Sequence, residues 1–222
     1  RELLEWACDV SSQWELPAEL NEDQAEKLRS AVGERALRIP LQHVTSRMFF
    51  RGLTLAARPG VFVVRPETEV LAGLAIDEAM SVVSRRGEAR VVDLERGDAT
   101  DPATLAHLDG MVDVVAPNPP YVPADEMPTQ PEASADPHVA LYGGSPDGTE
   151  IPARVARRAL TLLRPGGVLL MEHSPTQEEA IAAIAAQLEM TDIATLPDLV
   201  GRRRFLSARA PESTRPTASV TQ

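Results

Sequence analysis

The sequence predicts a three-layer α/β domain that follows a small helical piece. From residue 65 to residue 210, short continuous apolar runs alternate with segments of helical periodicity, which is typical of parallel strands covered by helices on both faces. Two further apolar runs near the C-terminus, separated by a short loop, predict a final antiparallel hairpin. Hydrophobic residues make up 43% of the 222 residues, so the chain can bury the core of one medium-sized domain.

Residues 1–39 are expected to be helical. The first apolar residues, up to Ala7, indicate the end of one helix, so the beginning of this piece is expected to be missing. Asn21 is a suitable N-cap for the next helix, and Gln24 follows three positions later, as a capping box requires. The apolar stripe expected on that helix consists of Ala25, Leu28, Val32 and Ala36.

Residues 40–64 are expected to link this piece to the main domain through a β-hairpin. Phe49 and Phe50 precede the dipeptide Arg51-Gly52, and the run Leu53–Leu55 follows it. Apolar runs on either side of a turn that contains glycine predict a pair of short antiparallel strands.

The main domain, residues 65–210, is expected to begin with a helix. Pro66 suits the first turn of that helix, and Glu67 and Glu69 lie favourably near its positive end. The buried face of this helix is expected to comprise Val70, Leu71, Leu74 and Ala75. Later helices are expected over Thr149–Leu163 and Gln177–Leu188. Arg164–Gly167 is expected to end the first of these two helices. The expected strands are Arg90–Leu94, Val112–Ala116, Val168–Met171, Met190–Leu196 and Arg204–Arg209, and residues 211–222 are expected to form a disordered tail.

The composition disfavours several classes of protein. The formal net charge is −11, which disfavours a nucleic acid as the main partner because phosphate binding depends on clustered Lys and Arg. No apolar run approaches the ~18 residues that a membrane span needs, and the first residues lack the layout of a secretory signal. The single cysteine, Cys8, cannot form an internal disulfide, which fits the cytoplasm. A cytoplasmic protein without a membrane partner is therefore expected, with a monomer as the default.

The tetrapeptide Asn118-Pro119-Pro120-Tyr121 carries the clearest chemical signal. It follows the run Val112–Ala116, and ligands of open α/β sheets bind beyond the carboxyl ends of strands. Two prolines hold the backbone extended and remove two N–H donors, which leaves carbonyl acceptors, the Asn118 amide and the Tyr121 ring. Such a site suits a planar group that bears an NH2, such as an amide or an exocyclic amine. The weaker interpretation is a stiffened loop in which Tyr121 caps the core.

Together with the rest of the chain, this tetrapeptide resembles the HemK/PrmC family, the protein-(glutamine-N5) methyltransferases that modify bacterial peptide-chain release factors. The resemblance covers nearly the whole chain except its tail. N-P-P-Y alone is shared with amino-methyltransferases acting on adenine, and the upstream motif Arg65-Pro66-Glu67-Thr68-Glu69 makes the match more specific. The other matching segments are Arg38–His43, Phe50–Gly52, Gly60–Val64, Val91–Leu94, Val112–Val115, Asp136–Gly144, Asp147-Gly148, Leu163–Gly167, Gly201-Arg202 and Arg204-Phe205.

The resemblance implies a seven-stranded Rossmann-like methyltransferase domain that uses S-adenosylmethionine, together with a small N-terminal helical domain and a β-hairpin linker. The implied substrate is the side-chain amide of the glutamine in the Gly-Gly-Gln loop of a release factor. Asn118 and the Pro119 carbonyl would accept the amide hydrogens. Pro120 would fix the loop, and Tyr121 would pack over the glutamine.

The resemblance also implies a set of residues that bind the cofactor. The methionine end would be bordered by Arg65, Pro66, Glu67, Thr68 and Glu69. Asp98 and Ala99 occupy the place where the family's loop touches the adenine, and Asp93 and Asn118 complete the set.

Other polar residues carry weaker signals. Glu172-His173 ends a predicted strand; we interpret it as a polar strand end, with an acid/base pair as the alternative. Arg202-Arg203-Arg204 is interpreted as a solvated turn, with a grip on the release factor or on ribosomal RNA as the alternative. No metal is expected, because the scattered His43, His107 and His138 do not show the spacing of metal ligands.

The chain departs from the family between Leu94 and Glu95. After Val91–Leu94, a methyltransferase of this class needs a Gly-rich loop and then an acidic residue at the end of a second strand. Here Glu95-Arg96-Gly97-Asp98 follow directly, so a segment is missing relative to the family. Either the protein has a mobile segment that the printed chain leaves out, which we favour, or the chain is a deleted paralogue unable to bind the cofactor.

A release factor glutamine methyltransferase is the leading hypothesis, and two alternatives stay open. One is an amino-methyltransferase that acts on adenine or on another protein amide. The other is a non-catalytic module that binds a release factor without the cofactor.

Overall fold

The computed structural model describes residues 1–92, 98–126 and 135–212. The chain divides into two compact units. The first holds residues 1–64 with the described part of 127–140, and the second holds residues 65–126 with the described part of 141–222. The finer division into 1–39, 40–64, 65–210 and a tail stays a prediction. Asp93 and the junction between Leu94 and Glu95 lie outside the described residues, as does the tail from residue 213.

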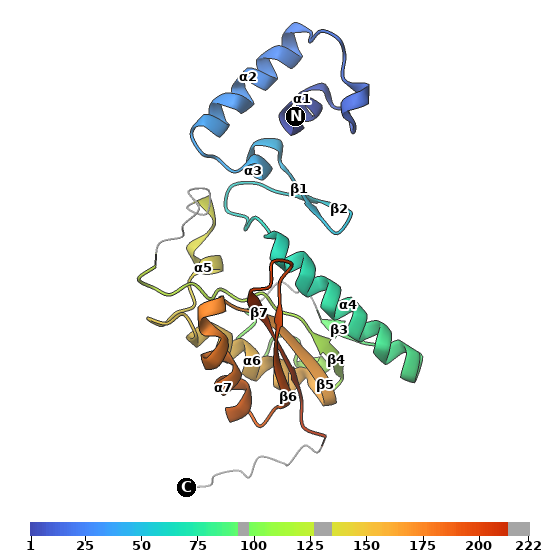
Figure 1. Cartoon of the computed structure of the whole chain (residues 1–222), viewed down its shortest axis with the longest axis vertical. Coiled ribbons are helices and arrows are strands. Elements are labelled where there is room, and N and C mark those ends of the chain that lie inside the picture. The colour runs from blue at the N-terminus through green and yellow to red at the C-terminus, as the bar shows by residue number, and fades with distance from the viewer. Residues whose placement is uncertain (93–97, 127–134, 213–222) are drawn as a thin grey trace. The chain divides into compact units, whose positions relative to one another are not determined.

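The first unit contains short helices and one hairpin (Figure 1). Its elements are α1 (Glu2–Cys8), the 3-10 turn η1 (Gln13–Glu15), α2 (Glu22–Ala36), α3 (Leu41–Thr45), β1 (Arg47–Phe50) and β2 (Leu53–Ala56). The predicted capping box is confirmed, since the side chains of Asn21 and Gln24 each accept a hydrogen bond from the backbone N–H of the other. The predicted hairpin is also confirmed, and both of its turn residues, Arg51 and Gly52, have positive φ.

One detail of the prediction for α2 is wrong. Val32 and Ala36 are exposed, whereas Ala31 is buried. The principal contacts of α2 are with α1 and α3. The less exposed side of α2 carries Leu28 and Ala31 rather than Val32 and Ala36, so the buried face is shifted around the helix from the predicted stripe.

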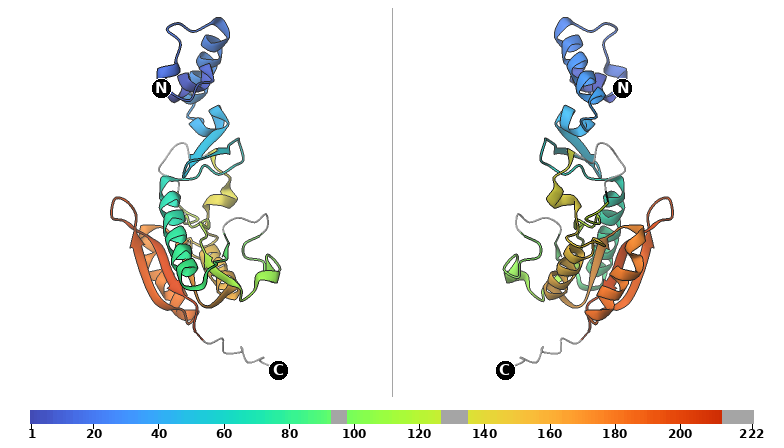
Figure 2. Two further views of the ribbon diagram at one scale, coloured as in Figure 1. Left: turned by 90° about the vertical axis from the view of Figure 1, so that its right-hand side faces the viewer. Right: turned by 90° about the vertical axis from the view of Figure 1, so that its left-hand side faces the viewer.

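The second unit is built on a mixed sheet in the order β3-β4-β5-β7-β6. Its strands are β3 (Val91–Val92), β4 (Val112–Val115), β5 (Leu163–Glu172), β6 (Thr191–Pro197) and β7 (Arg203–Arg209). The first three strands run parallel, and β7 runs antiparallel to both β5 and β6. Figure 2 shows this final hairpin in orange and red along one edge of the unit. The predicted α/β fold is confirmed; the described residues supply five strands of this sheet, and the count of seven stays a prediction.

Helices cover both faces of this sheet, which makes three layers (Figure 1). The helix α4 (Pro66–Arg86) packs against β4 and β5, begins at Pro66 as predicted and ends at Gly87 with positive φ. On the other face lie α6 (Glu150–Leu162) and α7 (Glu178–Gln187). The remaining short helices of this unit are η2 (Ala106–Leu108) and η4 (Pro175–Gln177), while α5 (His138–Leu141) belongs mostly to the first unit.

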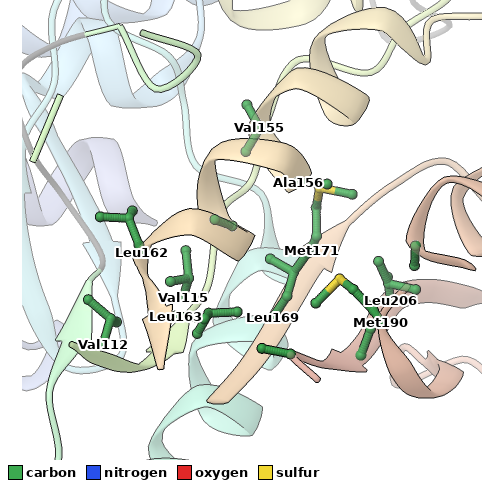
Figure 3. Packing of buried hydrophobic residues seen from close by; sticks show 14 of the residues in the cluster. Val112, Val115, Val155, Ala156, Leu162, Leu163, Leu169, Met171, Met190 and Leu206 are labelled. Carbon is green, nitrogen blue, oxygen red and sulfur yellow. The ribbon is translucent and has the colours of Figure 1, made fainter. Parts of the chain in front are cut away.

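Each face of the sheet has its own apolar core. Figure 3 shows the larger core, in which residues of β4 and β5 such as Val115 and Met171 lie against α6. The smaller core joins Leu71 of α4 to Phe205 of β7, and both side chains are buried. All four residues of β4 are buried, because this strand is covered on both faces. The site at its carboxyl end is therefore carried on a rigid element.

The helix expected over Thr149–Leu163 does end before Arg164–Gly167, since α6 stops at Leu162. The start of the next strand is predicted too late, at Val168, because Arg164–Gly167 already lies within β5. The pairing register jumps from Leu163 opposite Val112 to Val168 opposite Val114, so the residues between them bulge out of the ladder. Gly166 accommodates the bulge with a φ of 72°. Within the described residues, no helix has the length and apolarity needed to cross a bilayer.

Candidate active site

The Asn118–Tyr121 loop leaves the carboxyl end of β4, as predicted. Pro119 is buried, while the other three residues are partly exposed. The backbone N–H of Glu172 donates a hydrogen bond to the Pro117 carbonyl at 3.2 Å. Since β4 and β5 are parallel neighbours, their carboxyl ends meet at the same edge of the sheet.

Glu172, the last residue of β5, is the centre of a hydrogen-bonded group that we call the Glu172 network. Its members are Glu172, Thr68, Asn118 and Tyr121. The Thr68 hydroxyl donates to Oε2 of Glu172 at 2.9 Å, and the Tyr121 hydroxyl donates to Oε1 at 3.0 Å. The side-chain amide of Asn118 donates through Nδ2 to Oγ1 of Thr68 at 2.9 Å. Three segments that are distant in sequence therefore meet at one carboxylate.

Glu172 is 1% exposed. Burial raises the pKa of Glu172 and outweighs the hydrogen bonds from Thr68 and Tyr121, which act to lower it. Burial likewise raises the pKa of Tyr121, and the negative charge of Glu172 adds to this increase. Tyr121 is therefore a neutral hydrogen-bond donor at physiological pH.

Glu172 lies closer to the predicted site residues than the sequence indicated, since it accepts hydrogen bonds from Thr68 and Tyr121. The interpretation as a polar strand end placed it near the site, whereas the structure places it between three of the predicted site residues. The signal that could have found it is its position: like Asn118, it follows a buried parallel strand, and such strand ends converge on one edge.

His173 does not form the alternative acid/base pair with Glu172 in the described structure. Its Nδ1 lies 2.8 Å from the carbonyl oxygen of Ser174, and because a carbonyl only accepts, Nδ1 carries the proton. Burial lowers the pKa of His173, so the ring is neutral. Its Nε2 is buried and has no hydrogen-bond partner among the described residues.

Gln177, at the end of η4, holds the chain just beyond the tetrapeptide. Its Nε2 donates to the carbonyls of Tyr121 and Asp147, each at 2.7 Å, and its Oε1 accepts from the backbone N–H of Ser174 at 3.1 Å. Gly148 packs against the same Tyr121 carbonyl, and a Cβ atom there would lie 2.3 Å from that oxygen. Glycine is thus required at this position for steric reasons.

The first turn of α4 brings Glu67 and Thr68 to the same region. Thr68 belongs to the Glu172 network, and Glu67 forms ion pairs with Arg202 at 3.3 Å and Arg204 at 3.9 Å. Arg202 also pairs with the buried Asp198 at 2.9 Å. Two members of the basic cluster are therefore held by acidic residues beside the first turn of α4. Of the other residues expected here, Pro66 is exposed, and Arg65 and Glu69 are partly buried.

Asp98 and Ala99 lie in an exposed turn and are not joined to the Glu172 network by any hydrogen bond of the described residues. Oδ1 of Asp98 accepts from the Thr100 hydroxyl at 2.7 Å and from the Thr100 backbone N–H at 2.8 Å. These hydrogen bonds lower the pKa of Asp98. They are local, so the proposed contact with adenine stays a prediction. Asp93 lies outside the described residues.

Two acceptors beside the Glu172 network are open. Within the part of the chain that the structure describes, Oδ1 of Asn118 and the carbonyl oxygen of Pro119 accept no hydrogen bond. Both belong to the tetrapeptide, and the Tyr121 side chain is part of the same loop. This arrangement can receive a group that offers two N–H donors.

The chain has several curated relatives, although no family model matches it. The release factor glutamine methyltransferase of Bifidobacterium longum is 38% identical over 232 residues, covering 81% of this chain and 79% of that protein. The protein of the same name from Streptomyces coelicolor is 38% identical over 223 residues, with 80% and 78% covered. That from Mycobacterium tuberculosis is 33% identical over 227 residues, with 82% and 74% covered. Among solved structures, a release-factor-specific protein-(glutamine-N5) methyltransferase from Alicyclobacillus acidocaldarius matches with a TM-score of 0.41 and 19% identity, over 67% of this chain and 94% of that chain.

The aligned spans include residues that this chain lacks. The alignment with the Bifidobacterium protein has 232 positions, which is more than the 222 residues of this chain, yet only 81% of this chain takes part in it. Many positions of the alignment therefore hold a residue of the relative opposite a gap in this chain. That relative therefore carries residues inside the aligned span that have no counterpart in this sequence.

Proposed function

This chain belongs to the release factor glutamine methyltransferase family, and from this premise we propose its reaction. It transfers a methyl group from S-adenosylmethionine to the side-chain amide nitrogen of a glutamine. The glutamine is that of the Gly-Gly-Gln loop in a peptide-chain release factor. The structural observation that supports this reaction is the pair of open acceptors, Asn118 Oδ1 and the Pro119 carbonyl, beside the Glu172 network.

The open acceptors match the chemistry of a glutamine side chain. An amide NH2 has two N–H donors, and each acceptor takes one of them. Pro120 keeps the backbone extended so that the Pro119 carbonyl stays available. The Tyr121 ring provides an apolar surface against the planar amide. Asn118, Pro119, Pro120 and Tyr121 therefore form the proposed substrate-binding and catalytic set.

The reaction depends on positioning and electrostatics. An amide nitrogen is a weak nucleophile because its lone pair is delocalised into the carbonyl group. Hydrogen bonds from both N–H groups to Asn118 and Pro119 hold the nitrogen at attack distance and stabilise the positive charge that builds on it. As the nitrogen–methyl bond forms, the sulfur–methyl bond breaks, and the nitrogen then releases one proton to solvent. No general base is assigned.

The described residues fit the positively charged end of S-adenosylmethionine, which when bound supplies a sulfonium methyl group. Glu172 and the side-chain oxygen of Asn118 place negative or partly negative oxygens at this edge of the sheet, and such oxygens suit a cation. We propose that residues 65–69 and Asn118 border the methionine end. Asp98 and Ala99 would meet the adenine, and Asp93 would complete the binding set.

The test is methylation of a release factor and of a Gly-Gly-Gln peptide by the purified chain with S-adenosylmethionine. We expect the mass of one added methyl group on the glutamine. Asn118→Ala should reduce kcat by at least about a hundredfold with little change in thermal stability, because Asn118 is partly exposed. Methylation that survives this substitution would contradict the proposal. Transfer of label to DNA or RNA but not to the release factor would favour the adenine alternative.

A second candidate is a paralogue that binds a release factor without the cofactor. The observation that favours it is the alignment, in which a relative carries residues that this sequence lacks. Calorimetry with S-adenosylmethionine separates the two candidates, since this paralogue would show no binding. An intact mass of 24.0 kDa would show that the protein has no further residues.

We further propose that the protein acts in the cytoplasm as a monomer and on a protein substrate. The single Cys8 supports the cytoplasm, and the net charge of −11 supports a protein substrate over a nucleic acid; the monomer is the default expectation.

A further inference from the structure

We propose that Glu172 is a positioning residue that determines which side of the Asn118 amide faces the substrate. The inference rests on the proposed function, because it concerns the same bound glutamine. Glu172 acts on that glutamine only through Thr68 and Tyr121, to which it is hydrogen-bonded at 2.9 Å and 3.0 Å.

The direction of each hydrogen bond follows from the carboxylate. An ionised carboxylate only accepts, so the Thr68 hydroxyl must donate its one proton to Glu172. Oγ1 of Thr68 then has only lone pairs to offer its other neighbour. The group of Asn118 that meets Oγ1 must therefore be the donor, Nδ2, and this pair is 2.9 Å apart. Oδ1 of Asn118 is left to face the open side.

The orientation of Asn118 matters because the substrate group is itself a donor. With Oδ1 facing outward, Asn118 accepts an N–H of the glutamine amide. With the amide flipped, its NH2 group would meet the NH2 of the substrate, and neither could accept. An asparagine amide turns over easily unless its partners select one orientation, and here the selection comes from Glu172 through Thr68.

The second oxygen of the carboxylate orients Tyr121. The phenol hydroxyl donates to Oε1 of Glu172, which holds the ring in one position beside Asn118. Since both oxygens of Glu172 already accept a hydrogen bond, we assign it no role in removing the substrate proton. One buried group thus positions two residues of the tetrapeptide.

Protonation of Glu172 reverses the direction of the two hydrogen bonds that run from Asn118 to Thr68 and from Thr68 to Glu172; we call this pair of hydrogen bonds the relay. A neutral carboxyl group can donate to Thr68, and Thr68 can then donate to Oδ1 of Asn118, which turns the amide over. The charged and titratable groups that face Glu172 are Glu67 from α4, Tyr121 from the loop after β4 and Arg204 from β7. Burial raises the pKa of Glu172, so the loss of activity on the acid side should begin at a higher pH than for an exposed glutamate.

The first experiment compares steady-state methylation of a Gly-Gly-Gln peptide by the wild type, Glu172→Gln, Thr68→Val and the double variant. Each single variant should lower kcat by about tenfold. The double variant should be no slower than the slower single variant, because both substitutions interrupt one relay. Thr68→Ser retains the hydroxyl and should restore the rate. Glu179→Gln, on the exposed face of α7, is the matched control and should leave kcat unchanged.

The pH profile separates positioning from a structural role. In the wild type, kcat should fall as the pH is lowered through the pKa of Glu172. This acid limb of the pH profile should be absent in Glu172→Gln. Additive losses in the double variant, or an unchanged acid limb in Glu172→Gln, would overturn the inference while leaving the proposed methylation intact. A wild type that methylates nothing would instead contradict the proposed function.

A second measurement, by NMR, tests the inference without a methylation assay. The side-chain ¹⁵N–¹H₂ signals of Asn118, followed by NMR during a pH titration, should shift as Glu172 titrates. The shift should disappear in Thr68→Val and persist in Thr68→Ser. An Asn118 signal that is the same in all variants at every pH would overturn the inference.

Discussion

The hydroxyl group of Tyr121 donates a hydrogen bond to Oε1 of Glu172, and the two oxygen atoms are 3.0 Å apart. Tyr121 belongs to the loop that follows β4, whereas Glu172 ends β5. The contact therefore joins a residue of the N-P-P-Y motif to one that lies outside it. Removal from water raises the pKa of both groups, fully for the buried Glu172 and in part for Tyr121, so the phenol stays protonated as a donor.

Tyr121→Phe should lower kcat by about tenfold with little change in KM. The substitution removes one donor from a buried carboxylate, which costs about 1 to 2 kcal/mol, while the aromatic ring remains to cover the substrate. Initial rates on a Gly-Gly-Gln peptide measure this effect. Tyr121→Leu removes the ring as well and should also raise KM. If Tyr121→Phe keeps the full kcat, the hydroxyl contact is irrelevant to the reaction.

Glu172→Gln should make the folded state more stable near neutral pH than the wild type. The folded pKa of Glu172 lies above its unfolded value, so the protonated Glu172 is the form that suits the folded state. The stability that protonated Glu172 provides is fully present below the unfolded pKa and is lost as the pH rises through the folded pKa. Glutamine cannot ionise, so the variant does not lose this stability. Urea denaturation at several pH values should show the advantage of the glutamine variant shrinking toward acid pH. An advantage that grows toward acid pH would contradict the direction of the pKa shift.

Gly148→Ala should destabilise the fold by about 3 kcal/mol and abolish methylation. The new Cβ would lie 2.3 Å from the Tyr121 carbonyl oxygen, and the residue has a φ of 71°. Gly87→Ala is the matched control, since Gly87 has a φ of 86° but no atom within 4 Å of the added Cβ. It should cost about 1 kcal/mol and leave kcat unchanged. Equal losses in the two variants would mean that the close approach at Gly148 has no effect.

Asp113→Asn should destabilise the protein by about 2 kcal/mol near neutral pH. The buried carboxylate of Asp113 accepts from the Arg90 backbone N–H at 2.8 Å, from the Arg86 guanidinium at 2.7 Å and from Arg164. Burial alone would raise the pKa of Asp113, but these partners lower it overall. The stability they provide is present above the unfolded pKa and is lost as the pH falls through the folded pKa.

Denaturation curves at neutral and acid pH test the Asp113 prediction. The gap between the wild type and Asp113→Asn should close as the solution becomes acid. Asp77→Asn on the exposed side of α4 should stay within about 0.5 kcal/mol of the wild type. A gap that persists at acid pH would mean that the ion pairs at Asp113 are not its source.

Local features of the structure could be predicted because short stretches of sequence carry them. The capping box at Asn21 and the hairpin turn at Arg51-Gly52 depend on neighbours within three or four positions. The two local errors have tertiary causes. Val32 is exposed because the partners of α2 leave Ala31 buried in its place. β5 begins before Val168 because Leu163 already pairs with Val112 and pairing resumes at Val168 after the bulge.

By itself, the sequence determined the alternating α/β order, the strand that presents Asn118-Pro119-Pro120-Tyr121 and the chemistry of its acceptors. These depend on hydrophobic periodicity and on proline, which act locally along the chain. Only the tertiary structure decided that Thr68 and Glu172, 104 positions apart, meet beside Asn118. The orientation of an amide depends on the donors and acceptors around it, and those partners come together only when parallel strands align their carboxyl ends at one edge of the sheet.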